Sequence, residues 1–65
     1  MNRNPQGFKP GDRVRVTGAG HRDFGKAGVI VLLEGVEDDT HGKPRAHISS
    51  GPGFIHVSLP NLEKL

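Results

Sequence analysis

The residues best suited to bind an anion stand in and just before a glycine-rich loop, "GAGHRDFGK" at 18–26, which separates two valine-rich runs. Arginine, lysine and protonated histidine contact phosphate oxygens through charge and hydrogen bonds, mostly without regard to base sequence. The alternative is that the arginines merely solvate the outer face of a half-exposed strand. The candidates for phosphate contact are His21, Arg22 and Lys26 in the loop and Arg13 and Arg15 on the run before it.

Two phenylalanines could add stacking on unpaired bases, as in proteins that bind single strands. Phe24 lies in the loop, and Phe54 lies in a later run whose alternation points it outward. A lone phenylalanine is usually buried, so packing in the core or at a hinge is the alternative for Phe24. We therefore add Phe54 to the candidate nucleic-acid-binding residues.

His47 and His56 face each other in a predicted hairpin and could be two ligands of a metal ion. A zinc site needs three or four ligands, and no third ligand is fixed nearby. Arg45 beside them would repel a cation. We expect a polar surface pair, or a phosphate contact when the rings are protonated, and no metal.

A second cluster, Glu37, Asp38, Asp39 and His41, occupies a polar turn region. No rigid element holds these side chains together, so we expect a solvated loop, which would also keep a sheet edge from pairing with other chains. No metal or other cofactor is predicted here.

Catalysis finds little support in the sequence. The chain has no cysteine and no tyrosine, and no serine stands in a nucleophile elbow. Gly18-Ala19-Gly20 precedes no helix, so it is no dinucleotide fingerprint. A chain of 65 residues also leaves little room for a deep pocket. The sequence predicts a non-enzymatic binding module.

Short strands must position these residues. "RVRVT" at 13–17 alternates, with Val14 and Val16 facing inward. "AGVIVLLE" at 27–34 is apolar on both faces. That pattern suits a strand covered on both sides or one bending around a small barrel, and a short buried helix competes with it. Three consecutive β-branched residues favour the strand.

A hairpin follows, in which "RAHISS" and "FIHVS" flank Gly51-Pro52-Gly53. Pairing Ser50 with Gly53 places one apolar set inward, and a slip of one residue would turn an apolar set outward. The inward set is Ala46, Ile48, Ile55 and Val57, and the outward set is His47, Ser49, Phe54 and His56.

The chain then offers Leu59-Pro60-Asn61 as a tight or 3₁₀ turn and "LEKL" as a last strand. About five short strands, glycine- and proline-rich turns and no convincing helix predict an all-β domain, a small antiparallel barrel or sandwich. We expect residues 1–7 to form a disordered tail and residues 8–65 a single domain.

The charge is uneven along the chain. Residues 1–33 hold six basic against two acidic side chains, and residues 34–65 hold three against five. A basic half suggests an anionic partner on one side, although alternating strands alone could produce it. No apolar run approaches the roughly 20 residues of a membrane helix, and the N-terminus lacks a signal-like stretch. We expect a cytoplasmic protein, with no membrane partner. A core this small could gain stability from a partner or from oligomerisation.

"PGDRVRVTG", the basic glycine loop and "GKAGVIVLL" together resemble the KOW motif of SH3-like barrels, found in ribosomal proteins and transcription elongation factors. The resemblance covers less than half of the chain. It implies an SH3-like, KOW-type barrel that contacts RNA, and it implies structural turn glycines. The same segment also resembles the SH3-like domain of nitrile hydratase β subunits, which would imply at most an accessory role. The turn glycines are Gly11, Gly18, Gly25 and Gly28.

We therefore interpret the chain as a module that contacts RNA or a nucleoprotein machine, such as the ribosome or RNA polymerase, through its basic glycine-rich loop. Two alternatives stay open. One is a protein–protein interaction or assembly module, which the modest net charge of +2 favours. The other is binding to double-stranded DNA. Because a fold of this kind hosts many functions, the fold does not decide among the three.

Overall fold

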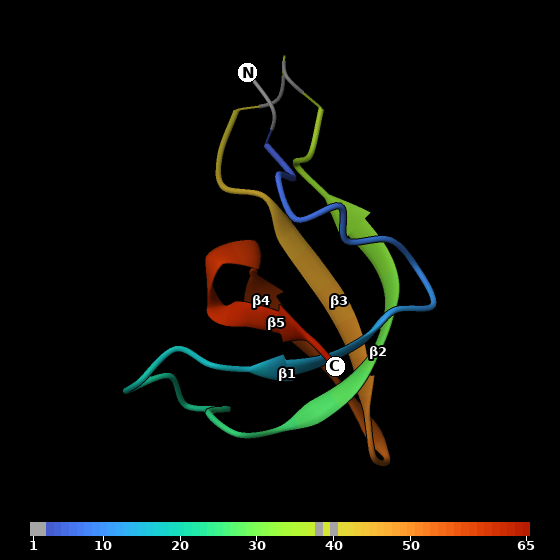
Figure 1. Cartoon of the computed structure of the whole chain (residues 1–65), viewed down its shortest axis with the longest axis vertical. Coiled ribbons are helices and arrows are strands. Elements are labelled where there is room, and N and C mark those ends of the chain that lie inside the picture. The colour runs from blue at the N-terminus through green and yellow to red at the C-terminus, as the bar shows by residue number, and fades with distance from the viewer. Residues whose placement is uncertain (1–2, 38, 40) are drawn as a thin grey trace.

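Five antiparallel strands form one sheet in the order β4-β3-β2-β1-β5 (Figure 1). The computed structural model describes residues 3–37, 39 and 41–65. The predicted all-β fold of about five short antiparallel strands is confirmed. The elements are β1 (Arg13–Val16), β2 (Ala27–Glu34), β3 (Arg45–Ser50), β4 (Gly53–Ser58), the 3₁₀ turn η1 (Leu59–Asn61) and β5 (Leu62–Lys64).

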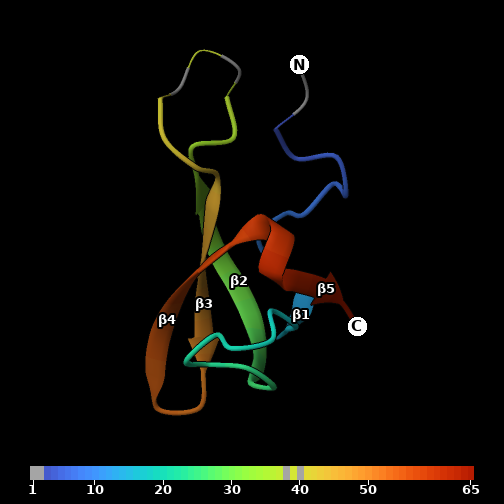
Figure 2. The same cartoon turned by 90° about the vertical axis from the view of Figure 1, so that its left-hand side faces the viewer.

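The sheet curls, so that β1, η1 and β5 lie together on one side of the layer formed by β2, β3 and β4 (Figure 2). Alternation along the strands turns one set of apolar side chains into the space between. The predicted inward positions Val14 and Val16 are buried there. The core consists of Phe8, Val14, Val16, Ile30, Ala46, Ile48, Val57, Leu59 and Leu62.

The hairpin of β3 and β4 has the predicted register. Ser50 pairs with Gly53, His47 with His56 and Ala46 with Val57. The four residues predicted to face outward are all at least partly exposed, while Ala46 and Val57 are buried. The predicted 3₁₀ turn and the closing strand are also confirmed.

Strand β2 contains a β-bulge, which explains its unusual composition. Its pairing with β3 passes from Ile30↔Ile48 to Leu32↔His47, so Val31 is the extra residue. A bulge reverses the alternation of a strand beyond it. Ile30 is therefore buried before the bulge and Leu33 packs against the core after it. The strand is bent and one of its faces is open to solvent, which decides between the two strand arrangements left open by the sequence.

The N-terminal segment folds back on the sheet. The Asn4 side chain donates to the Phe8 carbonyl at 2.8 Å and accepts from the Phe8 amide at 2.9 Å. Residues 1 and 2 lie outside the described residues, and residues 3–7 form a turn that leads into buried Phe8. The boundary of the domain at residue 8 stays a prediction. Among the described residues, no helix has the length and apolar character needed to cross a membrane.

Candidate nucleic-acid interface

The basic loop is a folded structure made of successive tight turns. Its two ends are tied together, because the Val16 amide donates to the Lys26 carbonyl at 2.8 Å and the Gly25 amide donates to the Val16 carbonyl at 2.9 Å. Gly25 has φ +88°, which favours glycine at this closure. Within the loop, the His21 amide donates to the Gly18 carbonyl at 2.9 Å. The loop therefore presents its side chains from a defined backbone.

Asp23 is the loop residue that sequence reasoning missed. It is 8% exposed, and its carboxylate lies 3.0 Å from the Lys26 ammonium. The hydrogen bond from Lys26 holds the pKa of Asp23 below its ordinary value. The Asp23 amide also donates to His21 Nδ1 at 3.0 Å, so a neutral ring carries its proton on Nε2. Asp23 thus orders the loop and offsets the charge of Lys26, which leaves Arg22 as its net cation.

The loop meets the start of β4 and forms a hollow of about 420 Å³ with it. Four of the predicted binding residues line this surface, namely His21, Arg22, Lys26 and Phe54. The Phe54 ring is 68% exposed, so its face is accessible. We call this surface the basic hollow. Its complete lining is His21, Arg22, Asp23, Lys26, Phe54, Ile55 and His56.

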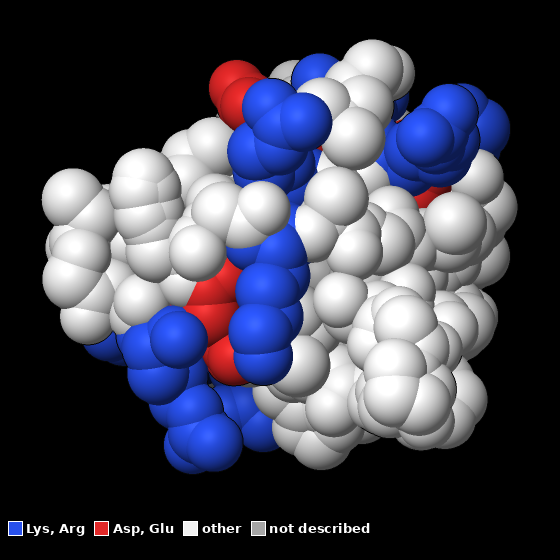
Figure 3. All heavy atoms as spheres, turned by 90° about the horizontal axis from the view of Figure 1, so that it is seen from below, with Lys and Arg blue, Asp and Glu red and all other residues white. Residues whose placement is uncertain are grey.

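The two strand arginines lie elsewhere. Arg13 and Arg15 are exposed on β1, opposite Val29 and Ala27 of β2, and neither lines the basic hollow. The Arg15 guanidinium lies 3.9 Å from the Glu63 carboxylate. Viewed from below, basic side chains form a band interleaved with acidic ones, between broad uncharged areas (Figure 3). The predicted set of cations is therefore divided between the hollow and β1.

Phe24, the phenylalanine of the loop, is neither buried in the core nor part of the basic hollow. Phe24 is 55% exposed and does not line the basic hollow. The alternative of core packing for Phe24 is therefore wrong. The loop is closed by backbone hydrogen bonds and by the buried Asp23 carboxylate, so it needs no aromatic anchor. His56 lines the hollow instead, two residues along β4 from Phe54 and on the same face.

The four glycines named from the sequence serve two different purposes. Gly11 and Gly25 have φ values of +97° and +88° in turns. Gly18 and Gly28 lie where another segment comes close. A Cβ on Gly18 would stand 2.7 Å from Asn61 Oδ1, and a Cβ on Gly28 would stand 2.2 Å from the Ser49 carbonyl oxygen. Gly28 therefore permits the close approach of β2 to β3.

The predicted histidine pair exists and is part of a small charged cluster. The His47 and His56 ring centroids lie 4.0 Å apart. Glu34 Oε1 lies 3.2 Å from His47 Nε2 and 3.3 Å from Arg45, although the His47 contact lacks the alignment of a hydrogen bond. His47, and after it Arg45, lowers the pKa of Glu34. Among the described residues, no group of three or more His, Cys, Asp or Glu side chains could hold a metal ion.

This cluster makes a pH-dependent contribution to stability. Because the pKa of Glu34 is lower in the folded chain than its ordinary value of 4.5, the contribution is present above that value and is lost as the pH falls through the folded pKa. Glu34→Gln should therefore reduce the stability lost between about pH 5 and pH 3. Urea titrations followed by far-UV circular dichroism would measure this loss. Glu63→Gln, which alters only the loose contact with Arg15, is the control, and equal acid sensitivity of wild type and Glu34→Gln would contradict the prediction.

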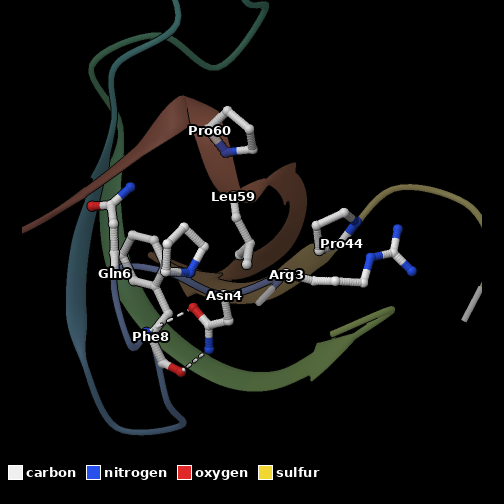
Figure 4. Close-up of a pocket in the computed structure, with 8 residues that line it drawn as sticks. Arg3, Asn4, Gln6, Phe8, Pro44, Leu59 and Pro60 are labelled. Carbon is white, nitrogen blue, oxygen red and sulfur yellow. Dashed lines mark hydrogen bonds between the residues drawn. The ribbon is translucent and has the colours of Figure 1, made fainter. Parts of the chain in front are cut away.

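A second hollow, of about 210 Å³, lies between the N-terminal turn and η1 (Figure 4). Its apolar lining comes from Pro5, Phe8, Pro44, Leu59 and Pro60, and Arg3, Asn4 and Gln6 also line it. Sequence reasoning missed it, because residues 3–7 carry no strand or helix signal. The hydrogen bonds between Asn4 and Phe8 hold these two lining residues in place.

The basic hollow thus combines two cationic side chains, two imidazoles and an exposed aromatic ring on one small surface. Such a combination can hold a phosphate and stack on a flat ring. No family model matches the chain, and neither a curated protein nor a solved structure matches it.

Proposed function

We propose that this chain is a non-enzymatic binding module that contacts single-stranded RNA, free or within a nucleoprotein machine, through the basic hollow. The observation that carries the proposal is that Arg22 and Lys26 of the loop meet the exposed ring of Phe54 at one surface. Proteins that bind single strands combine cations along the backbone with an aromatic ring under a base. The KOW-type resemblance supports the same function.

Geometry favours a single strand over a duplex. Phe54 projects from the beginning of β4, next to the Gly51-Pro52 turn, and it offers a flat face beside the loop cations. A stacked base must be unpaired, so a duplex could use the cations but not the ring. Arg13 and Arg15 on β1 would extend the contact along the phosphate backbone outside the hollow.

Charge reversal at Arg22 should weaken RNA binding roughly tenfold at low salt and reduce its salt dependence. Arg22 forms none of the ion pairs found in the described part of the chain, although its charge is one of those that lower the pKa of Asp23. The measurement is an amide-shift titration of labelled protein with single-stranded RNA and with duplex DNA, each at low and near-physiological salt. Lys43→Glu makes the same change of charge at an exposed residue outside the hollow and is the control.

The shifts should saturate and cluster at residues 18–26 and around Phe54. Phe54→Ala should weaken binding to single strands and leave duplex binding unchanged, which separates stacking from charge. If neither polymer changes the amide shifts of the protein at low salt, the proposal is refuted. Tighter binding to duplex DNA than to RNA would select the alternative of double-stranded DNA binding.

A specific observation favours a second candidate, a protein-interaction module. Strand β2 exposes Val29, Val31 and Leu32 on its outer face, at 39%, 44% and 45%. Contiguous apolar side chains on a surface often mark a protein contact. Phe54 of the basic hollow lies on the same side of the sheet, because it pairs with Ser49, which in turn pairs with Val29.

A further inference from the structure

The outer face of β2 and β3 carries an unusual apolar stripe for so small a domain. Val29, the bulge residue Val31 and Leu32 all project from β2 to solvent. Their cross-strand neighbours on β3 are Ser49 and His47, which are half-buried and uncharged or weakly basic. The other side of these strands is covered by β1, η1 and β5 (Figure 2). We call this stripe and its neighbours on β3 the outer face.

Glu34 and Arg45, two charges of opposite sign, stand at one end of this face, and Arg13 of β1 pairs with Val29 near the other end. Glu34 on β2 pairs with Arg45 on β3 in the sheet register, and their side chains lie 3.3 Å apart. Both side chains are about half exposed, so each can accept a further partner. On the outer face, Glu34 of β2 therefore lies directly opposite Arg45 of β3, and the apolar stripe follows along β2.

We propose that the outer face is the interface of a homodimer whose two-fold axis runs parallel to the strands, between β2 and β3. Under this symmetry each β2 lies over β3 of the other copy. Glu34 then faces Arg45 of the partner subunit, and Arg45 faces Glu34 of the partner subunit. Leu32 packs on His47 of the partner subunit, and Val29 packs on Ser49 of the partner subunit.

The alternative two-fold axis, perpendicular to the strands within the interface, is disfavoured by the same residues. It would superimpose the two ends of the face, so that Val29 would cover Glu34 of the partner subunit and Ser49 would cover Arg45 of the partner subunit. Each charge would then lie against an apolar or uncharged side chain of the other copy and would keep only its ion-pair partner within its own chain. The positions of Glu34 and Arg45 thus select one arrangement and identify a second copy as the occupant, because the face is complementary to itself.

Dimerisation would also stabilise a domain whose hydrophobic core is small. Two sheets that pack face to face bury their facing side chains in a layer about 10 Å thick. Burial of Val29, Val31 and Leu32 from both copies would add apolar contacts that a 65-residue chain lacks. The interface borders the basic hollow, because Phe54 and His56 of β4 pair with Ser49 and His47 on the same face of the sheet. Dimerisation itself requires no RNA.

Sedimentation equilibrium over a concentration series tests the dimer without any nucleic acid. We expect the wild-type mass to rise from monomer to dimer with a dissociation constant on the order of 10–100 μM. Arg45→Glu places like charges opposite each other at two symmetric contacts, so it should weaken the dimer at least about tenfold. The swap Glu34→Arg with Arg45→Glu should restore the wild-type constant to within roughly threefold.

Leu32→Ser separates interface from fold. Leu32 is about half exposed in the single chain, so this variant should dissociate while its melting curve in dilute solution stays that of the monomer. A wild type that remains monomeric up to about 1 mM would overturn the proposal. So would a dimer indifferent to Arg45→Glu, which would indicate pairing through the edge of β4, or a charge swap that fails to restore association.

Discussion

Gly28→Ala is expected to lower the free energy of unfolding by about 3 kcal/mol. The added Cβ would lie 2.2 Å from the Ser49 carbonyl oxygen and 2.7 Å from Ile48 Cγ2. The first of these is backbone, so it cannot turn aside as a flexible side chain would. β2 and β3 must separate at the point where Ser50 Oγ also donates to the Ala27 carbonyl at 2.9 Å.

A domain of this size has a stability of roughly 3–10 kcal/mol, so Gly28→Ala removes a large part of it. The chain has no tryptophan or tyrosine, so urea denaturation is best followed by far-UV circular dichroism. Gly53→Ala is the matched control. Gly53 also lies in a strand, its φ is not left-handed, and a Cβ there meets nothing within 4 Å. The control should change stability by less than about 0.5 kcal/mol, and an equal effect of both changes would show that strand separation is not the cause.

The parts of the fold that followed from sequence are those in which alternation and turn chemistry agree. In the β3–β4 hairpin, Ala46 and Val57 must both face inward and Gly51-Pro52 must turn, and only one register satisfies both conditions. β1 and the 3₁₀ turn were predictable for similar local reasons. Local patterns suffice wherever every residue of a strand obeys one alternation.

β2 departs from that rule. Its faces could not be assigned from "AGVIVLLE", because the bulge at Val31 changes the alternation in the middle of the strand. Only the pairing with β3 reveals which residues face outward, and pairing is a property of the whole sheet. The apolar stripe that carries the dimer proposal was therefore invisible in the sequence.

The candidate site was predictable as a set of residue types and only in part as a surface. Charge placement in the loop pointed to His21, Arg22 and Lys26, and the outward alternation of β4 pointed to Phe54. That these meet depends on how the loop folds toward β4, which is a long-range contact. Asp23 was missed because a single acidic residue among basic ones gives no signal that it is buried. The KOW-type kinship and the RNA partner stay predictions.

Phe8 was given no role by sequence reasoning, because its neighbours are polar and carry no periodic pattern. The structure places its ring in the core at 3% exposure, with the Lys64 ammonium 5.9 Å from the ring centroid. Phe8 also lines the N-terminal hollow, and Asn4 of the N-terminal turn donates a hydrogen bond to its carbonyl. A residue outside every strand thus covers one end of the core.

Phe8→Ala is therefore expected to cost about 3–5 kcal/mol of stability, the usual range for removing a buried aromatic ring. In a domain whose stability is roughly 3–10 kcal/mol, the variant should melt far below the wild type or lose cooperative unfolding. Phe24→Ala is the control, because the same atoms are removed from a ring that is 55% exposed, and its cost should stay below about 1 kcal/mol. Equal melting temperatures for Phe8→Ala and Phe24→Ala would mean that the N-terminal segment does not pack on the sheet, and the domain would then begin after Phe8.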